Sequence, residues 1–272
     1  MQKTILITGA TDGIGLATAK LLFSLGHHIL LHGRNSAKLA QTEQVLSALS
    51  VGGAKTGKSE SYIADLSHLP DVVALVKSIT ENHNKLDVLI NNAGVFNIPE
   101  PVTSRGLDVR FIVNTIAPYL LTKQLLSLLD ASGRVINLTS AAQSPVDLKA
   151  LTGQVNLSDQ AAYAQSKLAL TMWSVQMGFS LKDDGPVIVA VNPKSLLGSK
   201  MVKEAYGIAG GNLNIGAEIL RRASLSDEFA KASGQYFDND IGQFSSPHPD
   251  ALDEQKCQEI VRVIEQILVD KG

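Results

Sequence analysis

Short runs of apolar residues alternate along the chain with longer segments in which apolar positions recur every three or four residues. The runs predict strands that are buried on both faces, and the longer spacing predicts helices between them. Strands are expected over residues 3–9, 27–33, 61–65, 86–92, 133–140 and 186–192, with a seventh over 234–238. Helices are expected over about 14–25, 70–82 and 104–129, before residue 48, around 161–170, and in an amphipathic stretch that closes the chain.

This alternation predicts an α/β fold: a Rossmann-type doubly wound parallel sheet of about seven strands, with helices on both faces. No repeat or low-complexity linker interrupts it, so residues 1–272 are expected to form a single domain. The Gly- and Lys-rich stretch 50–60 is interpreted as a surface loop. The glycines and turn residues of 195–250 predict a lid over a substrate. Its aromatic residues could line a pocket, although simple packing is favoured: Tyr206, Tyr236, Phe237 and Phe244.

Composition narrows the possible partners. The formal net charge is −2, so no nucleic acid or anionic membrane is expected as a partner. No run approaches the ~20 apolar residues that span a bilayer, and the first residues enter a strand-like run at once, so neither a transmembrane segment nor a secretory signal is expected. Cys257 is the single cysteine and the six histidines show no ligand spacing, so neither a disulfide nor a metal is expected. A reducing cytoplasm is the expected location.

The stretch TGATDGIG, residues 8–15, connects the first strand to the first helix and predicts a dinucleotide site. Gly9, Gly13 and Gly15 allow a tight turn, a close approach of a pyrophosphate, and access to unpaired N–H groups at the helix N-terminus. Their G-x-x-x-G-x-G spacing differs from the commoner G-x-G-x-x-G. A simple connecting turn is the alternative, but the flanking strand and helix favour a binding site.

The end of the second strand indicates which coenzyme is preferred. NAD sites usually carry an acid about 20 residues after the glycines, but no acid occurs here between Asp12 and Glu43. Arg34 stands near the expected position, and a guanidinium suits a 2′-phosphate. NADP(H) is therefore expected in preference to NAD(H). The alternative is that Arg34 is a solvated residue at the start of a helix.

A tyrosine and a lysine stand four residues apart in AAYAQSKLAL (161–170), so Tyr163 and Lys167 share one helix face. A free phenol has a pKa of about 10, and the Lys167 ammonium is expected to lower it. Tyr163 could then protonate the oxyanion that hydride transfer to a carbonyl leaves, and act as a base in the reverse direction. An ordinary surface pair is the alternative.

Five short motifs occur in order: TGATDGIG (8–15), ADL (64–66), NNAG (91–94), INLTS (136–140) and YAQSK (163–167). With them the sequence resembles the classical short-chain dehydrogenases/reductases over most of its length, most firmly from residue 4 to about 193. The resemblance implies catalytic roles for Asn114, Ser140, Tyr163 and Lys167, with Ser140 donating a hydrogen bond to the substrate oxygen. It also suggests a homodimer or homotetramer. The coenzyme contacts expected from the glycine turn, the second strand and the resemblance are Gly9, Thr11, Asp12, Gly13, Ile14, Gly15, Arg34, Asn35, Asp65, Leu66, Asn92, Ala93, Gly94, Tyr163, Lys167 and Pro193.

Pro118 lies inside the helical segment VNTIAPYLLT. Proline lacks an N–H and crowds the carbonyl four residues earlier, which belongs to Asn114. That carbonyl is expected to lose its helical partner and to hold a water. The resemblance implies that Asn114 anchors a water leading from Lys167 to bulk solvent. The alternative is a simple kink that fits the helix to the sheet.

Two departures from the family pattern matter. Ser140 and Tyr163 lie 23 positions apart, and this longer loop, with SKLA (166–169), resembles the retinol-dehydrogenase branch. After the sixth strand the family usually has a Pro-Gly turn, but here Lys194 follows Pro193, and Ser199 stands one place beyond the usual threonine. The turn beside the nicotinamide is therefore expected to differ.

The resulting interpretation is an NADP(H)-dependent oxidoreductase that acts on a small-molecule carbonyl or alcohol. A catalytically silent NADP(H)-binding sensor or scaffold protein is the second interpretation, which the presence of Ser140, Tyr163, Lys167 and Asn114 disfavours. A sugar-nucleotide epimerase or dehydratase is the third. Such enzymes usually show a TGxxGxxG turn and a longer C-terminal portion, and neither feature is found here.

Overall fold

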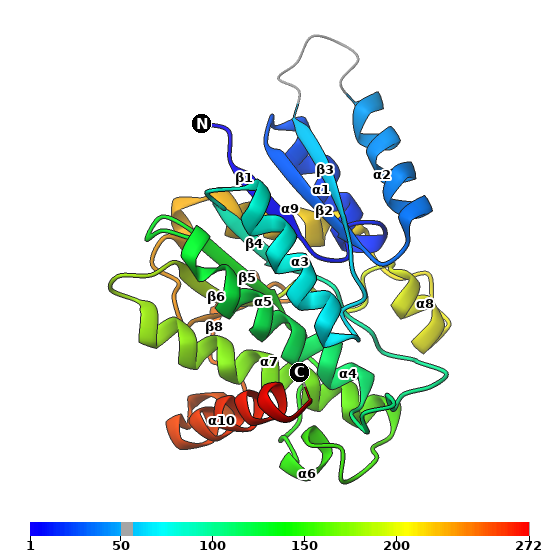
Figure 1. Ribbon diagram of the computed structural model, residues 1–272, viewed down its shortest axis with the longest axis vertical. Helices are drawn as coiled ribbons and strands as arrows, with labels where there is room; N and C mark the ends of the chain where they lie inside the picture. Colours follow the sequence, from blue (N-terminus) through cyan, green and yellow to red (C-terminus); the bar gives the residue numbers. More distant parts are fainter. Residues whose placement is uncertain (50–56, 272) are drawn as a thin grey trace.

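The computed structural model describes residues 1–49 and 57–271 and is built around one eight-stranded sheet (Figure 1). The strand order is β3-β2-β1-β4-β5-β6-β7-β8, and every neighbouring pair is parallel except β7 and β8. The strands are β1 (Thr4–Ile7), β2 (His28–Gly33), β3 (Lys58–Ile63), β4 (Val88–Asn91), β5 (Arg134–Leu138), β6 (Val187–Asn192), β7 (Tyr236–Asp238) and β8 (Gln243–Ser245).

Ten α-helices are described in residues 1–49 and 57–271. They are α1 (Gly13–Ser24), α2 (Ser36–Ala48), α3 (Leu69–Asn82), α4 (Val109–Phe111), α5 (Ala117–Leu125), α6 (Leu148–Leu151), α7 (Asp159–Leu181), α8 (Lys200–Tyr206), α9 (Leu213–Leu225) and α10 (Glu254–Lys271). A π-helical turn, Ile112–Ile116, joins α4 to α5. Side chains cap the helices that reach the site, with Asp12 before α1, Asn35 before α2 and Ser158 before α7.

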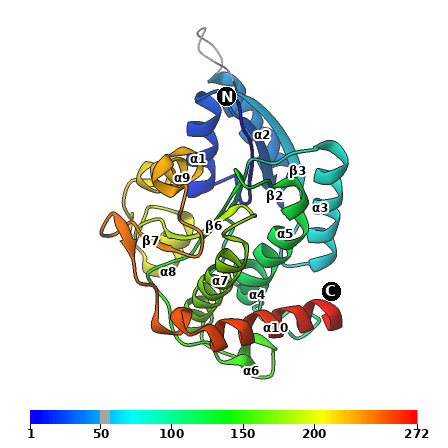
Figure 2. The same ribbon diagram turned by 90° about the vertical axis from the view of Figure 1, so that its left-hand side faces the viewer.

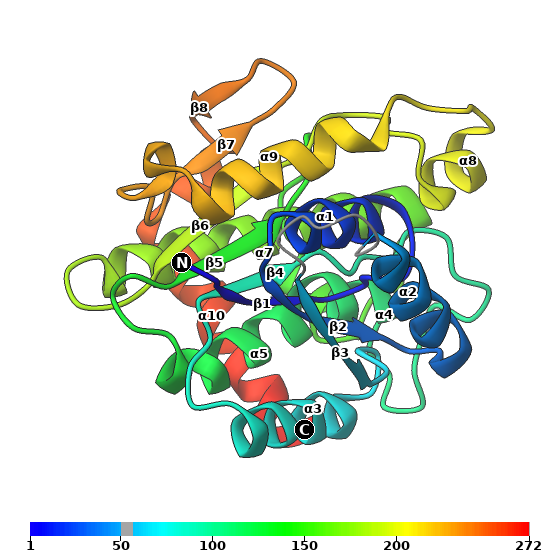
Figure 3. The same ribbon diagram turned by 90° about the horizontal axis from the view of Figure 1, so that it is seen from above.

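The helices form a layer on each face of the sheet, as the continuous apolar strands predict (Figures 2 and 3). Alternate strand residues point to opposite sides. Ile5 and Ile7 belong to the core shared with α1, α2 and α9, whereas Leu6 belongs to the core shared with α3, α5 and α7. Helix α10 packs on α7, where Ile260 and Ile264 are buried. None of the helices in residues 1–49 and 57–271 combines the length and apolarity needed to cross a membrane.

The α/β class and the parallel order are confirmed, and the following elements differ from the expected ones. Strand β8 was not predicted, because a three-residue segment with one apolar residue between two polar ones carries no clear period. Strand β3 begins at Lys58 rather than residue 61, so residues 58–60 of the expected loop belong to a strand, and residues 50–56 lie outside the described ones. The expected helix over 104–129 begins only at Val109 and contains a π turn between α4 and α5, just before Pro118. Helical structure continues through Pro118, which is the second residue of α5.

The strand order places the site. Because β1 has β2 on one side and β4 on the other, the chain reverses its direction of winding between β1 and β4. In open α/β sheets the crevice at such a reversal, outside the carboxyl ends of the strands, is where ligands bind.

Candidate active site

A cleft of about 540 Å³ lies at the carboxyl ends of the strands. All sixteen residues expected to contact the coenzyme line this cleft, including Gly9, Arg34, Tyr163 and Lys167. A larger and shallower hollow of about 920 Å³ lies between α1 and α9, and none of the expected catalytic residues lines it. The sequence-predicted coenzyme residues are therefore brought together in one place.

The glycine turn forms a close-fitting backbone cradle at one end of the cleft. Gly9 has φ of +66°, and a Cβ there would come within 3.0 Å of Ala93 Cα. A Cβ on Gly15 would overlap the carbonyl oxygen of Gly9. The turn leads into the N-terminus of α1, whose N–H groups and helix dipole favour an anion. These features fit the pyrophosphate of a dinucleotide.

Asn92 holds this turn against β4. Its Nδ2 donates to the carbonyl oxygens of Thr8 at 2.8 Å and Gly9 at 3.2 Å. The Thr8 hydroxyl in turn accepts the backbone N–H groups of Asn92 and Ala93, both at 3.0 Å. The NNAG motif therefore supports the glycine turn through side-chain and backbone hydrogen bonds.

His32 ties the glycine turn to the loop after β3, and the sequence analysis missed this role. Its Nδ1 accepts the N–H of Gly9 at 3.3 Å, and its Nε2 lies 3.1 Å from the carbonyl oxygen of Ala64. Because a carbonyl can only accept, Nε2 carries the proton and Nδ1 carries the lone pair. Burial lowers the pKa of His32 to about 4, so the ring is neutral near pH 7. A polar residue within an otherwise apolar strand was the available signal.

Two exposed cations stand at the end of the cleft that β2 and α2 form. Arg34 and Lys38 both line it. Asn35 caps α2, because its Oδ1 accepts the N–H of Lys38 at 2.9 Å. Lys38 was not predicted, although its position one turn into the helix after Arg34 would place it there. On the opposite side Asp65 accepts both the backbone N–H and the hydroxyl of Ser67, at 2.9 and 2.7 Å.

Helix α7 carries Tyr163 and Lys167 to the middle of the cleft. Lys167 is 4% exposed, and its Nζ donates to the carbonyl oxygen of Leu138 at 2.7 Å. The same Nζ lies 5.8 Å from the centroid of the Tyr163 ring. Ser140 follows β5, and its Oγ accepts the N–H of Ala142 at 3.1 Å, which leaves the hydroxyl proton free to be donated.

The expectation that Lys167 acidifies Tyr163 is not met in this structure. Burial is the largest cause and raises the pKa of Tyr163 to about 12, while a hydrogen bond from Ser140 lowers it. Burial also lowers the pKa of Lys167 to about 8. Removing the phenolate and the ammonium from water costs more than their mutual attraction returns, and a sequence motif does not reveal that cost.

Asn114 is fully buried in the π turn and holds three segments together. Its Oδ1 accepts the N–H of Val95 at 2.8 Å, and its Nδ2 donates to Val95 O at 3.0 Å and to Ser166 Oγ at 2.9 Å. The side chain therefore links the loop after β4 to α7. That the Asn114 carbonyl holds a water stays a prediction.

The loop after β6 is strained at the position where the family pattern has glycine. Lys194 has φ of +109° and Leu196 has φ of +54°, which are unfavourable for residues with a Cβ. The β7–β8 turn holds this loop: Asn239 Nδ2 donates to Pro193 O at 3.0 Å, and Asp240 accepts the Ser195 hydroxyl at 2.6 Å. These hydrogen bonds offset the backbone strain.

Replacing Lys194 by glycine is expected to raise the free energy of unfolding by about 0.5–1 kcal/mol, because glycine adopts a positive φ without the steric cost of a Cβ. Chemical denaturation would measure the change. Lys194→Ala is the control, since it removes the ammonium but keeps the Cβ. An equal gain in stability from alanine would show that charge, and not backbone strain, is responsible. An unchanged kcat in Lys194→Gly would show that the departure from the family turn is harmless to catalysis.

The buried ammonium of Lys167 is expected to cost stability. Its pKa is about 8 in the folded protein and about 10.5 when unfolded, so the unfolded chain binds more protons between these values and the free energy of unfolding rises with pH across that window. Lys167→Met should therefore raise the free energy of unfolding at pH 7 by about 1–3 kcal/mol and remove this rise. Denaturant titrations of both proteins at pH 7 to 10 would measure it. A variant less stable than wild type at pH 7 would contradict the assignment.

Aromatic rings lie beside Tyr163 on the open side of the cleft. The Phe96 ring centroid is 4.7 Å from that of Tyr163, and the Tyr206 ring, at the end of α8, is 6.1 Å from Phe96. Phe96, Met201 and Glu204 also line the cleft and were not predicted, since no motif marks them. Tyr236, Phe237 and Phe244 belong to the packing of the sheet, as the simpler interpretation expected.

Sequence and structure comparisons find dehydrogenases and oxidoreductases among the proteins similar to this chain. The short chain dehydrogenase family profile matches residues 3–206. Retinol dehydrogenase 13 of Homo sapiens is 29% identical over 277 residues, which cover 95% of this chain and 82% of that protein. Polyprenol dehydrogenase of Homo sapiens is 33% identical over 197 residues, which cover 70% of this chain and 58% of that protein. The crystal structure of a metagenomic short-chain oxidoreductase in complex with NADP has a TM-score of 0.61 and 27% identity, and the match covers 82% of this chain and 90% of that one.

The family match extends from β1 to the end of α8 and includes the whole cleft. These relatives are named as dehydrogenases or as an oxidoreductase, and the cleft fits a nicotinamide dinucleotide. The chain therefore belongs to the short-chain dehydrogenase family, in its retinol-dehydrogenase-like branch, and is an oxidoreductase that acts on CH–OH and C=O groups.

Proposed function

We propose that the protein is an NADP(H)-dependent reductase or dehydrogenase in which Tyr163 is the general acid and base. The observation that carries this proposal is the convergence of Tyr163 and Lys167 on the cleft that begins at the glycine turn. The hydroxyl of Ser140 donates a hydrogen bond to the same phenol, which lowers the pKa of Tyr163. Any one of these residues could be structural alone, but together they supply a proton donor, a cation and a hydrogen-bond donor at one point.

The preference for NADP(H) rests on charge at the end of β2. Arg34 and Lys38 are both exposed and both line the cleft. The first acidic residue after Asp12 is Glu43, and it accepts the Ser61 hydroxyl at 2.7 Å. A 2′-phosphate would meet two cations there and no carboxylate from the β2–α2 connection.

The chain's own groups account for the proton transfer. A bound nicotinamide supplies or accepts the hydride at the substrate carbon. In reduction the Tyr163 phenol, which stays protonated at neutral pH because of its raised pKa, donates its proton to the substrate oxygen as negative charge develops. With substrate bound, the Ser140 hydroxyl donates its one proton to that oxygen in place of the phenol, and the Lys167 ammonium favours the phenolate that remains. In oxidation Tyr163 takes the proton back.

The substrate side of the cleft supports an apolar carbonyl or alcohol. Phe96 and Met201 line it, and Phe96 lies against the ring of Tyr163. The relatives named retinol dehydrogenase and polyprenol dehydrogenase are consistent with an apolar alcohol or its carbonyl. A panel of aldehydes and ketones, followed by loss of NADPH absorbance, tests the function. Tight NADPH binding with no turnover of any of them would instead favour a sensor or scaffold protein.

The proposal includes one domain over residues 1–272, with 195–250 as the substrate lid and C-terminal region. Segment 195–250 contributes Ser199, Met201 and Glu204 to the cleft through α8 and the turn before it. Its other elements, α9 and β7–β8, pack on α1 and extend the sheet, so the lid role is proposed for the part around α8. A cytoplasmic location and a homodimer or homotetramer stay predictions.

A further inference from the structure

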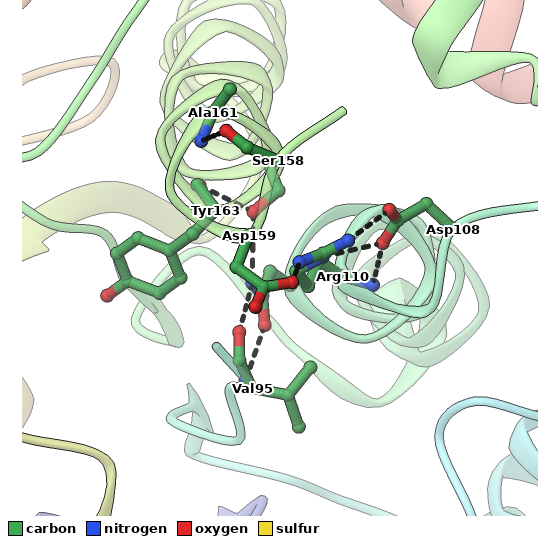
Figure 4. Close-up of polar contacts among 9 residues, drawn as sticks. Val95, Asp108, Arg110, Ser158, Asp159, Ala161 and Tyr163 are labelled. Carbon is green, nitrogen blue, oxygen red and sulfur yellow. Dashed lines mark hydrogen bonds and ion pairs between the residues drawn. The ribbon is translucent and has the colours of Figure 1, made fainter. Parts of the chain in front are cut away.

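A buried arginine joins the first turn of α7 to the segment that carries Asn114 (Figure 4). Arg110, in α4, is 1% exposed. Its Nε and Nη2 donate to the two carboxylate oxygens of Asp108 at 2.9 and 2.6 Å, and its Nη1 donates to Asp159. Asp108, Arg110 and Asp159 are called the Arg110 cluster below.

The cluster lies one turn before Tyr163 along α7. Asp159 is the first residue of α7, and Tyr163 follows it by four positions, so both leave the same part of the helix. Figure 4 shows the Asp159 side chain directed at Arg110 and the neighbouring Tyr163 ring directed away from the Arg110 cluster. A change in the rotation of this turn would therefore move the phenol.

A second attachment lies just beyond Tyr163. Asn114 Nδ2 donates to Ser166 Oγ at 2.9 Å, and the Thr115 hydroxyl donates to Ser166 O at 2.8 Å. Ser166 Oγ donates to the carbonyl oxygen of Tyr163 at 2.7 Å. The segment 108–116 thus holds α7 on both sides of Tyr163, at Asp159 and at Ser166.

The ionic character of the first attachment needs an explanation. Asp108 alone neutralises the guanidinium charge and is itself mostly buried, so Asp159 is not required for charge balance. Apolar side chains of similar volume would join two helices at least as strongly as a buried ion pair. A planar guanidinium, however, fixes the direction of each hydrogen bond, and apolar contacts do not fix the rotation of a helix in this way.

We propose that Arg110 and Asp159 are a positioning pair, which sets the rotation of the first turn of α7 and thereby the place of the Tyr163 phenol in the cleft. The proposal rests on the proposed function only in that Tyr163 is the group positioned. Neither residue touches the cleft, so the pair acts through Tyr163.

Asp159→Ala is the informative variant, because it removes both oxygens that can accept from Arg110, Asp159 is half exposed, and its loss leaves the Arg110–Asp108 pair intact. With an active carbonyl substrate, kcat is expected to fall about tenfold or more, as for small misplacements of a catalytic group, with an unchanged dissociation constant for NADPH. Arg110→Lys keeps the charge but cannot meet both carboxylates with a forked geometry. Its kcat should therefore fall by a similar factor. Glu228→Ala, which removes the forked pair with Arg222 outside the site, is the matched control and should keep wild-type kcat.

A second measurement separates this proposal from the proposed function. The chain has five tyrosines, so ring-labelled tyrosine gives five NMR signals, and the one missing in Tyr163→Phe identifies Tyr163. Asp159→Ala should shift that signal and leave the Tyr236 signal in place. An unmoved Tyr163 signal overturns the positioning pair, whatever happens to kcat or thermal stability. A shifted signal in a protein that turns over no substrate would support the pair and reject the reductase.

Discussion

Tyr163→Phe is expected to lower kcat for carbonyl reduction by about 10²–10⁴-fold, the range that a positioned general acid contributes. Phenylalanine keeps the ring that packs at 4.7 Å from Phe96 but has no proton to give to the substrate oxygen. NADPH binding should stay close to wild type, because the glycine turn and the Arg34 end of the cleft are untouched. Steady-state kinetics at the NADPH absorbance and a fluorescence titration of NADPH measure the two quantities.

The control for this variant is Tyr236→Phe, which removes a phenol hydroxyl from β7, away from the cleft. It should leave kcat unchanged. If Tyr163→Phe kept wild-type kcat, another group would have to supply the proton and the assignment of Tyr163 would be wrong. If both binding and kcat were lost together, the ring would be needed for the fold of the cleft rather than for chemistry.

Arg34→Ala is expected to weaken NADPH binding roughly 10- to 100-fold, since a hydrogen bond to a charged group contributes about 1.5–3 kcal/mol. NADH lacks the 2′-phosphate, so its dissociation constant should hardly change. Arg34→Ala combined with Lys38→Ala should weaken NADPH further, because Lys38 is the second cation at this end of the cleft. Titrations with both coenzymes at one fixed salt concentration provide the comparison, since screening alters charge effects.

Lys77→Ala serves as the matched control, because Lys77 is a 75% exposed cation on α3 and does not line the cleft. It corrects for the change in net charge. Equal losses for NADPH and NADH in Arg34→Ala would reject the 2′-phosphate assignment and would leave Arg34 as a general support of the adenosine end.

The sequence predicted most of the fold because its strands are short continuous apolar runs and its helices keep a clear period. Strand β8 has only three residues and depends on its pairing with Phe237 and its neighbours in β7, which no local pattern reveals. Helix α9 was likewise missed, although it covers one face of the sheet beside α1. Its amphipathic sequence was read as part of the lid because glycines precede it.

The candidate site was predictable where a motif marks it, as at Gly9, Tyr163 and Lys167. His32 and Arg110 were missed because each works through contacts with residues distant in sequence, such as Ala64 and Asp159. The pKa of Tyr163 was mispredicted for a related reason. Neighbouring residues in sequence reveal a nearby charge, but they do not reveal how much water the fold removes from around it.

The π turn at Ile112–Ile116 makes contacts to the active-site helix α7 and precedes the contacts to the C-terminal helix α10. One extra residue in a helix rotates everything beyond it by about 100°, since an α-helix has 3.6 residues per turn. That rotation directs Asn114 towards Val95 and, further along, directs Tyr119 and Lys123 towards Glu265 on α10. Deleting or adding a single codon here would thus disturb the active-site helix and the anchoring of the chain's last helix at once.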